Sequence, residues 1–173
     1  DDVLPKHAEL LEQNIQEMFN GEALPAHVAS SNAYLGAVAI RDALDLGADI
    51  VITGRVVDSA VVLAPLLHEY KWSLDDYDKL AQGSLAGPVI ECGAQCTGGN
   101  FTDRRLVQGL DNLGFPIVEV NADASFIVTK PQGTGGLVST ATVAEQIVYE
   151  IGNPQAYLLR DVTADFSQVH LEQ

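Results

Sequence analysis

The chain has 173 residues, of which 47 % are hydrophobic and 19 % are charged, and its formal net charge at pH 7 is −15. This length and balance indicate one compact domain, residues 1–173, with a hydrophobic core of its own. The negative charge argues against a nucleic-acid partner and against anionic membrane surfaces, because both need a basic protein surface. No apolar run reaches the length of a membrane-spanning helix.

In the first part of the chain, the sequence pattern predicts two helices and a strand. Residues 6–19 carry apolar side chains at helical spacing, which indicates an amphipathic surface helix. A second helix is predicted over residues 33–47, with Gly47 as its C-terminal stop and a cap from one of three polar residues, Ser30, Ser31 or Asn32. Residues 48–54 are apolar and β-branched, which is typical of a strand buried in a parallel sheet.

Two further helices are predicted after this strand. Residues 57–70 form the first, in which Pro65 is expected to kink the helix or to start a second one. Residues 73–86 form the next, with an end near Gly83 or Gly87. Helix, strand and helix in short succession indicate a layered α/β fold with a mainly parallel sheet and flanking helices.

In the last third of the chain, the sequence pattern predicts both strands and a helix. Residues 115–130 read as two strands around a turn at residues 121–123. A helix is predicted over residues 137–152, and two more strand candidates follow in residues 156–171. We therefore expect some antiparallel strands toward the C-terminal part of the fold.

The segment before this last helix combines a lysine with three glycines. Glycine lets backbone N–H groups approach a ligand closely, and the helix that follows presents its positive end. We therefore predict that an anion or phosphate is bound by Lys130, Gly133, Gly135, Gly136 and Ser139. No GK[ST] sequence ends the glycine run, so a nucleotide-hydrolysing P-loop is not indicated. The alternative is a glycine-rich turn that serves only backbone geometry.

A second glycine-rich segment spans residues 92–103. Gly98 and Gly99 permit close backbone approach, and Asn100 offers hydrogen-bonding groups, so we predict that they contact a polar ligand. Asp103, at the end of this segment, is a candidate catalytic acid or base. A purely structural turn explains the segment equally well.

Three further residues are placed for binding or catalysis. Arg55 and Asp58 directly follow the predicted parallel strand, where ligands bind in open α/β sheets. We expect Arg55 to hold a carboxylate or phosphate, and Asp58 to act as a base or to cap the next helix. Glu91, beside the cysteine-containing loop, is a further candidate acid or base.

The two cysteines, Cys92 and Cys96, lack the additional cysteine or nearby histidine that a zinc site requires. The four histidines show no metal-binding spacing either, so no metal site is predicted. Free thiols agree with a reducing, cytoplasmic setting. A nucleophilic Cys96 is the less favoured alternative, because no histidine is adjacent in sequence to activate it.

Three long segments carry a resemblance to a known family. They are VASSNAYLGAVAIRDALDLGADIVITGRVVDSAVVLAPL, LAGPVIECGAQCTGGNFTD and KPQGTGGLVSTATVAEQIVYEIG. In this order they resemble the N-terminal domain of the acyclic terpene utilisation (AtuA-like) proteins, over nearly the whole chain. Family members are longer at both ends, so the resemblance implies that this chain is a fragment of a longer protein.

The resemblance implies a role in the bacterial breakdown of acyclic terpenes such as citronellol and geraniol through acyl-CoA intermediates. It implies a small anionic ligand, an acyl-CoA or its carboxylate, and an enzyme of the lyase, hydratase or hydrolase type, but it names no cofactor. The alternative is a non-catalytic subunit or scaffold of an acyl-CoA-processing complex. The expected assembly is a homo-oligomer or such a catabolic complex.

Two positions depart from the family pattern. Pro88 stands where a histidine is expected, and Arg104 stands where an aromatic residue is expected. If that histidine is catalytic in relatives, this chain lacks the activity. If it is structural, the change matters little.

Overall fold

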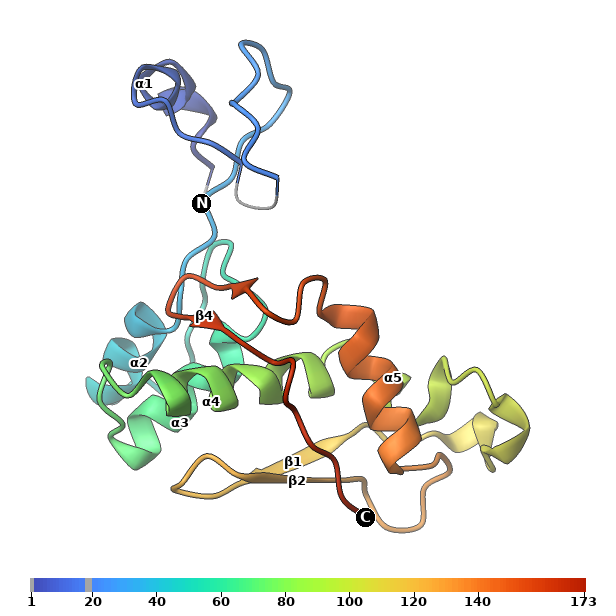
Figure 1. Ribbon diagram of the computed structural model, residues 1–173. Helices are drawn as coiled ribbons and strands as arrows, with labels where there is room; N and C mark the ends of the chain where they lie inside the picture. The colour runs from blue at the N-terminus through green and yellow to red at the C-terminus, as the bar shows by residue number, and fades with distance from the viewer. Residues whose placement is uncertain (1, 18–19) are drawn as a thin grey trace.

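A computed structural model describes residues 2–17 and 20–173 (Figure 1). Its centre is a layer of three helices, α2 (Val38–Asp45), α3 (Ala60–Tyr70) and α4 (Tyr77–Ile90). Helix α3 packs against both α2 and α4, so that apolar side chains of the three helices share one core. These helices hold the remaining elements in place.

A hairpin and a fifth helix pack against this layer. Strands β1 (Ile117–Val120) and β2 (Phe126–Thr129) pair in antiparallel register, with Ile117 opposite Thr129. The hairpin lies under α4 in Figure 1, and α5 (Thr140–Glu150) also packs against α4. No helix in the described part of the chain is both long and apolar enough to cross a membrane.

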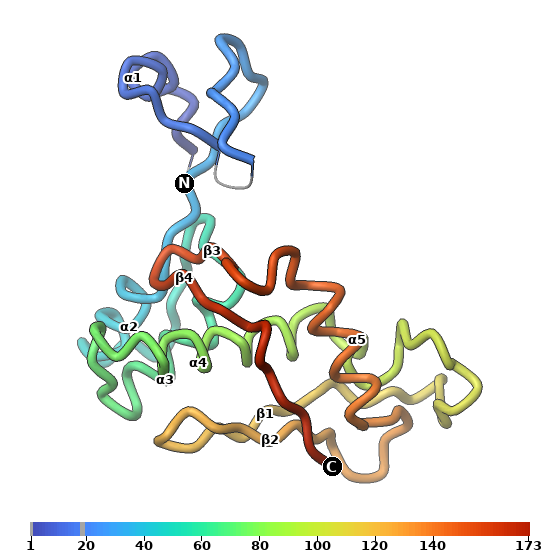
Figure 2. Tube along the Cα trace, viewed as in Figure 1, coloured from blue at the N-terminus to red at the C-terminus, as the bar shows by residue number. Residues whose placement is uncertain are grey.

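The N-terminal segment stands apart from the rest of the molecule (Figure 2). A 3₁₀ turn at Leu4–Lys6 continues into α1 (His7–Glu12), and the segment bonds to itself through the Val3 N–H and the Ser31 carbonyl oxygen, 2.8 Å apart. The predicted helix over residues 6–19 is therefore correct only in its first half, and its residues 18 and 19 lie outside the described residues. The division of the chain into one domain stays a prediction.

Helix α2 begins later than predicted and has a different N-terminal partner. It starts at Val38, and none of the three predicted capping residues caps it. Instead, the Ala37 N–H donates to Asp161 Oδ2 at 2.9 Å, across 124 positions of sequence. At the other end Gly47 adopts a φ of 87° just past the helix, which confirms the predicted stop.

Helix α4 runs through both glycines that were predicted to end it. A Cβ on Gly87 would lie 2.6 Å from Ser59 Cα, and a Cβ on Gly83 would lie 3.0 Å from side-chain atoms of Leu63 and Trp72. The prediction was wrong because these glycines permit close packing against α3 and Trp72, while the helix backbone continues to Ile90. Likewise, Pro65 lies inside one helix, α3, and no second helix starts there.

The predicted layered parallel sheet is not present among the described residues. Parallel pairing is limited there to single bridges, such as Leu35 with Val56. Residues 48–54 are not a strand, and the side chains of Ile50 and Ile52 are 83 % and 92 % exposed. The β-branched pattern predicted a strand, but a strand forms only where a neighbouring strand accepts its hydrogen bonds, and the described chain supplies none.

The predicted antiparallel strands near the C-terminus are confirmed. Besides the β1–β2 hairpin, β3 (Tyr157–Leu158) and β4 (Thr163–Ala164) form a short antiparallel pair. The hairpin is tied to the helical layer by Tyr70, whose hydroxyl donates to the Val120 carbonyl at 2.6 Å, and by Trp72, whose Nε1–H donates to the Ala122 carbonyl at 3.0 Å. The two rings stack with centroids 5.4 Å apart.

Helix α5 has a complete N-terminal cap. Ser139 Oγ accepts from the Thr142 N–H at 3.2 Å, and Thr142 Oγ1 accepts from the Ser139 N–H at 3.0 Å. This reciprocal pair satisfies backbone donors that the first helical turn leaves open. The predicted helix after the glycine loop is confirmed, although it ends at Glu150 rather than Gly152.

Candidate functional site

The two glycine-rich segments pack against a third loop and form one unit, which we call the loop cluster, residues 94–100, 107–114 and 131–137. Three consecutive backbone N–H groups, those of Gly135, Gly136 and Leu137, donate to the carbonyl oxygens of Asn112, Gln108 and Thr97 at 2.7, 2.8 and 2.9 Å. A cradle for an anion needs such N–H groups to be available for the ligand. Here they hold the loops together.

The glycines of the loop cluster are needed mainly for close packing. A Cβ on Gly98 would meet the Val107 side chain at 2.8 Å, and one on Gly136 would meet the Thr97 carbonyl oxygen at 2.8 Å. Gly99 and Gly135 face the backbones of Ala94 and Gly109 in the same way. These contacts favour the structural alternative for the four glycines. Gly133 differs, because its turn has a φ of +76° and leaves open space around the Cα atom.

Lys130 is held within its own loop but lines a groove. Its Nζ donates to the Thr134 carbonyl oxygen at 2.7 Å and lies 3.4 Å from Thr134 Oγ1. The side chain is half-buried, and the ammonium group has three donors, so it keeps a donor for a ligand. These bonds place the charge at a fixed point.

The groove has a volume of about 1050 Å³ and lies between β2, the first turn of α5 and residues 168–173. Of the predicted ligand-binding residues it gathers Lys130, Gly136 and Ser139. Its apolar walls include Phe126, Val128, Leu137, Val138, Val143 and Leu171. His170 and Glu172 also line it and lie 3.5 Å apart, as an exposed pair. The groove therefore combines apolar walls with a fixed cation.

Arg55 lies outside this groove. Its guanidinium carbon stands 4.7 Å from the centre of the Tyr34 ring, in a cation–π contact, and its side chain is exposed. Asp58 does not cap α3, because Ser59 is the N-cap residue and no side chain caps that helix. The predicted cap role of Asp58 is thus wrong, which leaves its charge free for another contact.

Asp58 and Glu91 are brought together by the packing of α3 against α4. Asp58 precedes Ser59, Glu91 follows the last residue of α4, and Gly87 lets the two helices approach closely at this point. Glu150, the last residue of α5, is the third member of this acidic cluster. Burial raises the pKa of the Glu91 carboxyl, and the charges of Asp58 and Glu150 raise it further.

Asp103 does not join the acidic cluster. It is exposed, it starts the 3₁₀ turn Arg104–Leu106, and it is not among the charges that raise the pKa of Glu91. Asn100 is exposed on the rim of a smaller cavity beside α5. Of the three predicted acids and bases, the structure therefore gathers only two.

Cys92 extends the acidic cluster. Its Sγ donates to Glu150 Oε1 at 3.7 Å, and the backbone of Cys92 adopts a φ of 60°. Burial raises the pKa of the thiol, and the carboxylates of Glu150 and Glu91 raise it further. One ligand atom each from Glu91, Cys92 and Glu150 lie within 4.8 Å of one another, so these residues could hold a divalent cation. No metal site was predicted from the sequence.

Two more residues connect to the cluster. The half-buried Tyr157 of β3 has a raised pKa, chiefly through burial and then through the charges of Glu150 and Glu91. Gln146 donates from Nε2 to the Pro88 carbonyl oxygen at 2.8 Å and to Glu150 Oε1 at 3.3 Å. Pro88, one of the two positions that depart from the family pattern, thus anchors α5 to α4 through its backbone.

Cys96 is not suited to nucleophilic chemistry. Its side chain is fully buried, and burial raises its pKa to about 11. A thiol reacts as its thiolate, which is scarce at neutral pH when the pKa is that high. Both cysteines are free in the structure, as predicted.

Sequence reasoning did not predict a functional role for Cys92, Gln146, Glu150 or Tyr157. Cys92 is adjacent to Glu91, and Gln146 and Glu150 share one face of a helix at i, i+4 spacing. No signal in the sequence connects the end of α4 with the end of α5, because that contact exists only in the folded chain.

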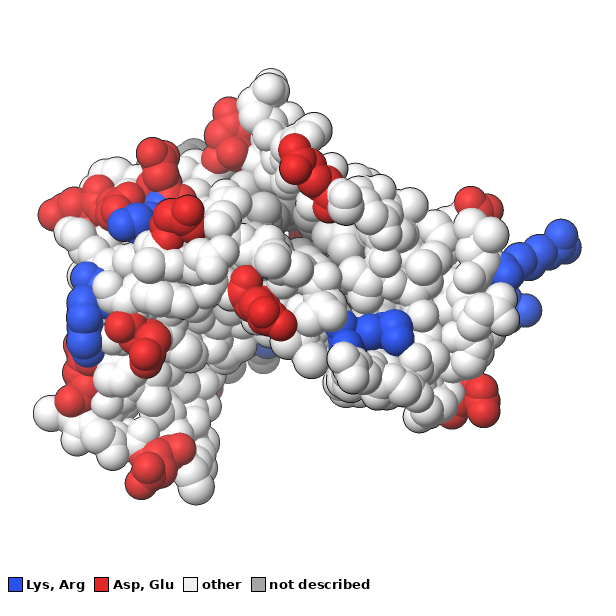
Figure 3. All heavy atoms as spheres, turned by 90° about the horizontal axis from the view of Figure 1, so that it is seen from below, with Lys and Arg blue, Asp and Glu red and all other residues white. Residues whose placement is uncertain are grey.

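Charge over the molecule is predominantly negative. Figure 3 shows acidic residues spread over the underside, with the few basic residues in separate places rather than in one patch. The absence of a nucleic-acid or membrane partner stays a prediction.

Comparison with known proteins identifies the family. The family described as "Acyclic terpene utilisation family protein AtuA" matches residues 1–173, the whole chain. This chain belongs to the AtuA family. No protein with a curated description and no solved structure matches it. The family description connects this AtuA-family chain with acyclic terpene utilisation, and the geometry above is the basis for a more specific proposal.

Proposed function

We propose that this chain binds an acyl-CoA or a free carboxylate formed in acyclic terpene breakdown, and that the groove beneath the first turn of α5 is the binding site. The observation that carries the proposal is the groove itself, which joins apolar walls to the Lys130 ammonium. A branched acyl chain would bury its methyl groups against those walls. Its anionic group would lie near Lys130 and the positive end of α5.

The acidic cluster is the proposed catalytic group. Glu91 has a raised pKa, so it keeps its proton to a higher pH than an ordinary glutamic acid and suits a general acid. Asp58 and Glu150, beside it, would accept protons. Proton transfer of this kind serves a lyase, a hydratase or a hydrolase.

The distance between groove and cluster restricts the ligand. Ser139 caps one end of α5 and Glu150 ends the other, so about 16 Å of helix separates them at 1.5 Å per residue. Only an elongated ligand can contact both regions. An acyl-CoA meets this requirement, whereas a short carboxylate would occupy the groove alone.

The test is calorimetric titration with coenzyme A, a branched acyl-CoA, a free terpenoid acid and inorganic phosphate. We expect the acyl-CoA to bind most tightly, and Lys130→Met to weaken it about tenfold, the loss of one charge-assisted hydrogen bond. Lys130→Arg should retain most of the affinity. Lys79→Met is the matched control, because Lys79 pairs with Asp76 at 3.2 Å on α4, outside the groove. Equal affinity in the Lys130→Met and Lys79→Met variants would overturn the proposal.

A non-catalytic subunit or scaffold is the second candidate function. It is favoured by the apolar side chains of Leu46, Ile50 and Ile52, which are 89 %, 83 % and 92 % exposed. Exposed apolar side chains that lie close together in sequence often mark a protein interface. Sedimentation of the chain with and without an Ile52→Lys substitution tests it. A larger assembly that this change dissociates, together with no ligand binding, would favour the subunit over the enzyme.

A further inference from the structure

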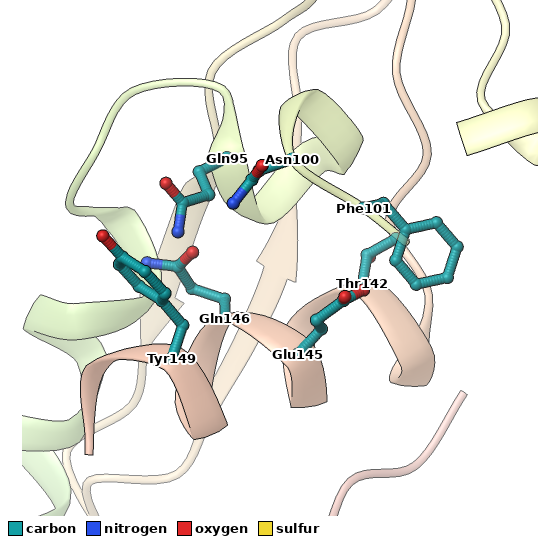
Figure 4. A pocket seen from close by; sticks show the side chains of 7 residues that line it. All are labelled: Gln95, Asn100, Phe101, Thr142, Glu145, Gln146 and Tyr149. Atoms are coloured by element: carbon teal, nitrogen blue, oxygen red, sulfur yellow. The ribbon is translucent and has the colours of Figure 1, made fainter. Parts of the chain in front are cut away.

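A small cavity lies between the loop cluster and α5, on another face of that helix than the groove. Its volume is about 90 Å³, enough for several water molecules or for a ligand of a few heavy atoms. Figure 4 shows the side chains that line it. They include three carboxamides, those of Gln95, Asn100 and Gln146, with Tyr149 at one end and Phe101 at the other.

Gln146 contributes to this cavity a hydrogen-bond acceptor that has no partner among the described residues. Its side chain is only 2 % exposed, and both of the bonds described above use its Nε2 atom, which the Pro88 carbonyl oxygen fixes in place. The Oε1 atom on the other side of the carboxamide is buried and accepts no hydrogen bond from any described residue. A buried acceptor without a donor is costly, so such an atom calls for a ligand or a bound water.

The other two carboxamides face the same space. In Figure 4 the side chains of Gln95 and Asn100 extend from the loop cluster toward Gln146. Neither side chain has a hydrogen-bond partner among the described residues, so both a donor and an acceptor are available on this wall. The cavity thus offers one fixed acceptor opposite two adaptable carboxamides.

We propose that this cavity binds a small neutral group that carries both an N–H donor and a carbonyl acceptor, such as a carboxamide. The donor bonds Gln146 Oε1, and the carbonyl oxygen accepts from the Asn100 and Gln95 amides. This site is distinct from the groove and does not depend on the proposed function.

The charges around the cavity exclude an anionic ligand. Glu145 forms part of the wall, and its carboxylate already accepts from the Thr102 N–H at 3.1 Å and from the Thr102 hydroxyl. Glu150 lies one helical turn beyond Gln146 on α5. A carboxylate in the cavity would meet these negative charges and would bring no donor to Gln146 Oε1.

The experiment is an NMR titration of the side-chain amide resonances of the ¹⁵N-labelled chain with acetamide. We expect the Gln146 resonances to shift in a saturable way. Acetate, which has the same shape but is anionic and lacks a donor, should leave them unchanged. The double variant Gln95→Ala/Asn100→Ala should bind acetamide about tenfold more weakly, because it removes two hydrogen-bond partners while Gln146 is retained.

Two controls make the result specific. Asn112→Ala removes an exposed carboxamide of the loop cluster that does not line the cavity, so acetamide affinity should not change. Lys130→Met should not change it either, which separates this site from the groove. A linear shift without saturation, an equal response to acetate, or unchanged affinity in the double variant would overturn the proposal.

Discussion

The two ends of helix α5 differ in their electrostatic environment. At the first end the Ser139 cap, the exposed dipole of the helix and Lys130 favour a negative charge in the groove. At the C-terminal end, which is the negative pole of the same helix, Glu150 lies near Glu91 and Asp58. The first arrangement stabilises an anion, whereas the second opposes ionisation. One helix therefore separates a region suited to anion recognition from a region suited to proton transfer.

Among the substitutions that test this difference between the two ends of α5, Gly87→Ala should change the stability of the chain most. The new Cβ would lie 2.6 Å from Ser59 Cα and would push α3 and α4 apart where Asp58 and Glu91 meet. We expect a loss of about 2 kcal/mol in the free energy of unfolding, the usual cost of overpacking a close contact. Urea denaturation followed by circular dichroism measures it.

Gly152→Ala is the matched control for that experiment. Gly152 has no atom within 4 Å of an added Cβ, and its φ is not positive, so stability should change by less than about 0.5 kcal/mol. Equal stabilities for the two variants would contradict the contact between α4 and Ser59.

The next effect should come from Ser139→Ala, at the opposite end of α5. It removes the oxygen that accepts from the Thr142 N–H, and the expected loss is about 1 kcal/mol in the free energy of unfolding. Ser30→Ala is the control, because Ser30 is exposed and caps none of the helices in the described part of the chain. If both variants had wild-type stability in urea, the capping bond would not contribute.

The smallest effect should come from Glu91→Gln, which removes one charge from the acidic cluster. Because the pKa of Glu91 is higher in the folded chain than in the unfolded chain, ionisation opposes folding. This cost is absent below the ordinary pKa of a glutamic acid and is fully present above the raised pKa. Thermal unfolding from acidic to neutral pH should therefore show a higher midpoint for the variant at neutral pH only.

Glu12→Gln provides the control for that pH series. Glu12 is an exposed residue of α1, in the N-terminal segment that stands apart from the cluster (Figure 2), so Glu12→Gln should not reproduce the higher midpoint at neutral pH. A Glu91→Gln profile that runs parallel to wild type at all pH values would show that no ionisation is opposed at this site.

Local features of the sequence predicted local structure well. The β1–β2 hairpin and the stop at Gly47 follow from short-range turn and cap chemistry, and the structure confirms both of them. The helix predicted over residues 137–152 is also present, but it begins three residues later, at Thr140. Helix α4 shows the limit of this approach. The sequence pattern predicts that Gly83 or Gly87 ends this helix. In the structure both glycines lie within the helix, where the close approach of Ser59 and Trp72 from other parts of the chain leaves no room for a side chain.

The candidate site was predictable only in part, for the same reason. Lys130 and Ser139 could be assigned to one region because both are near the glycine loop in sequence. The proximity of Glu91 to Glu150 depends on the packing of α4 with α5, which periodicity does not reveal. The prediction of a parallel sheet was wrong for another reason. Residues 48–54 have the composition of a strand, but no partner strand is present among the described residues.

The fluorescence of Trp72 can be used to observe the packing of the β1–β2 hairpin separately from the rest of the fold. This residue is the single tryptophan of the chain, it is 6 % exposed, and it bonds the turn of the β1–β2 hairpin while it stacks on Tyr70 of α3. Its fluorescence therefore reports whether the hairpin is docked on the helical layer. Because β2 also forms one wall of the groove, a ligand that moved the hairpin would change this emission without any added label.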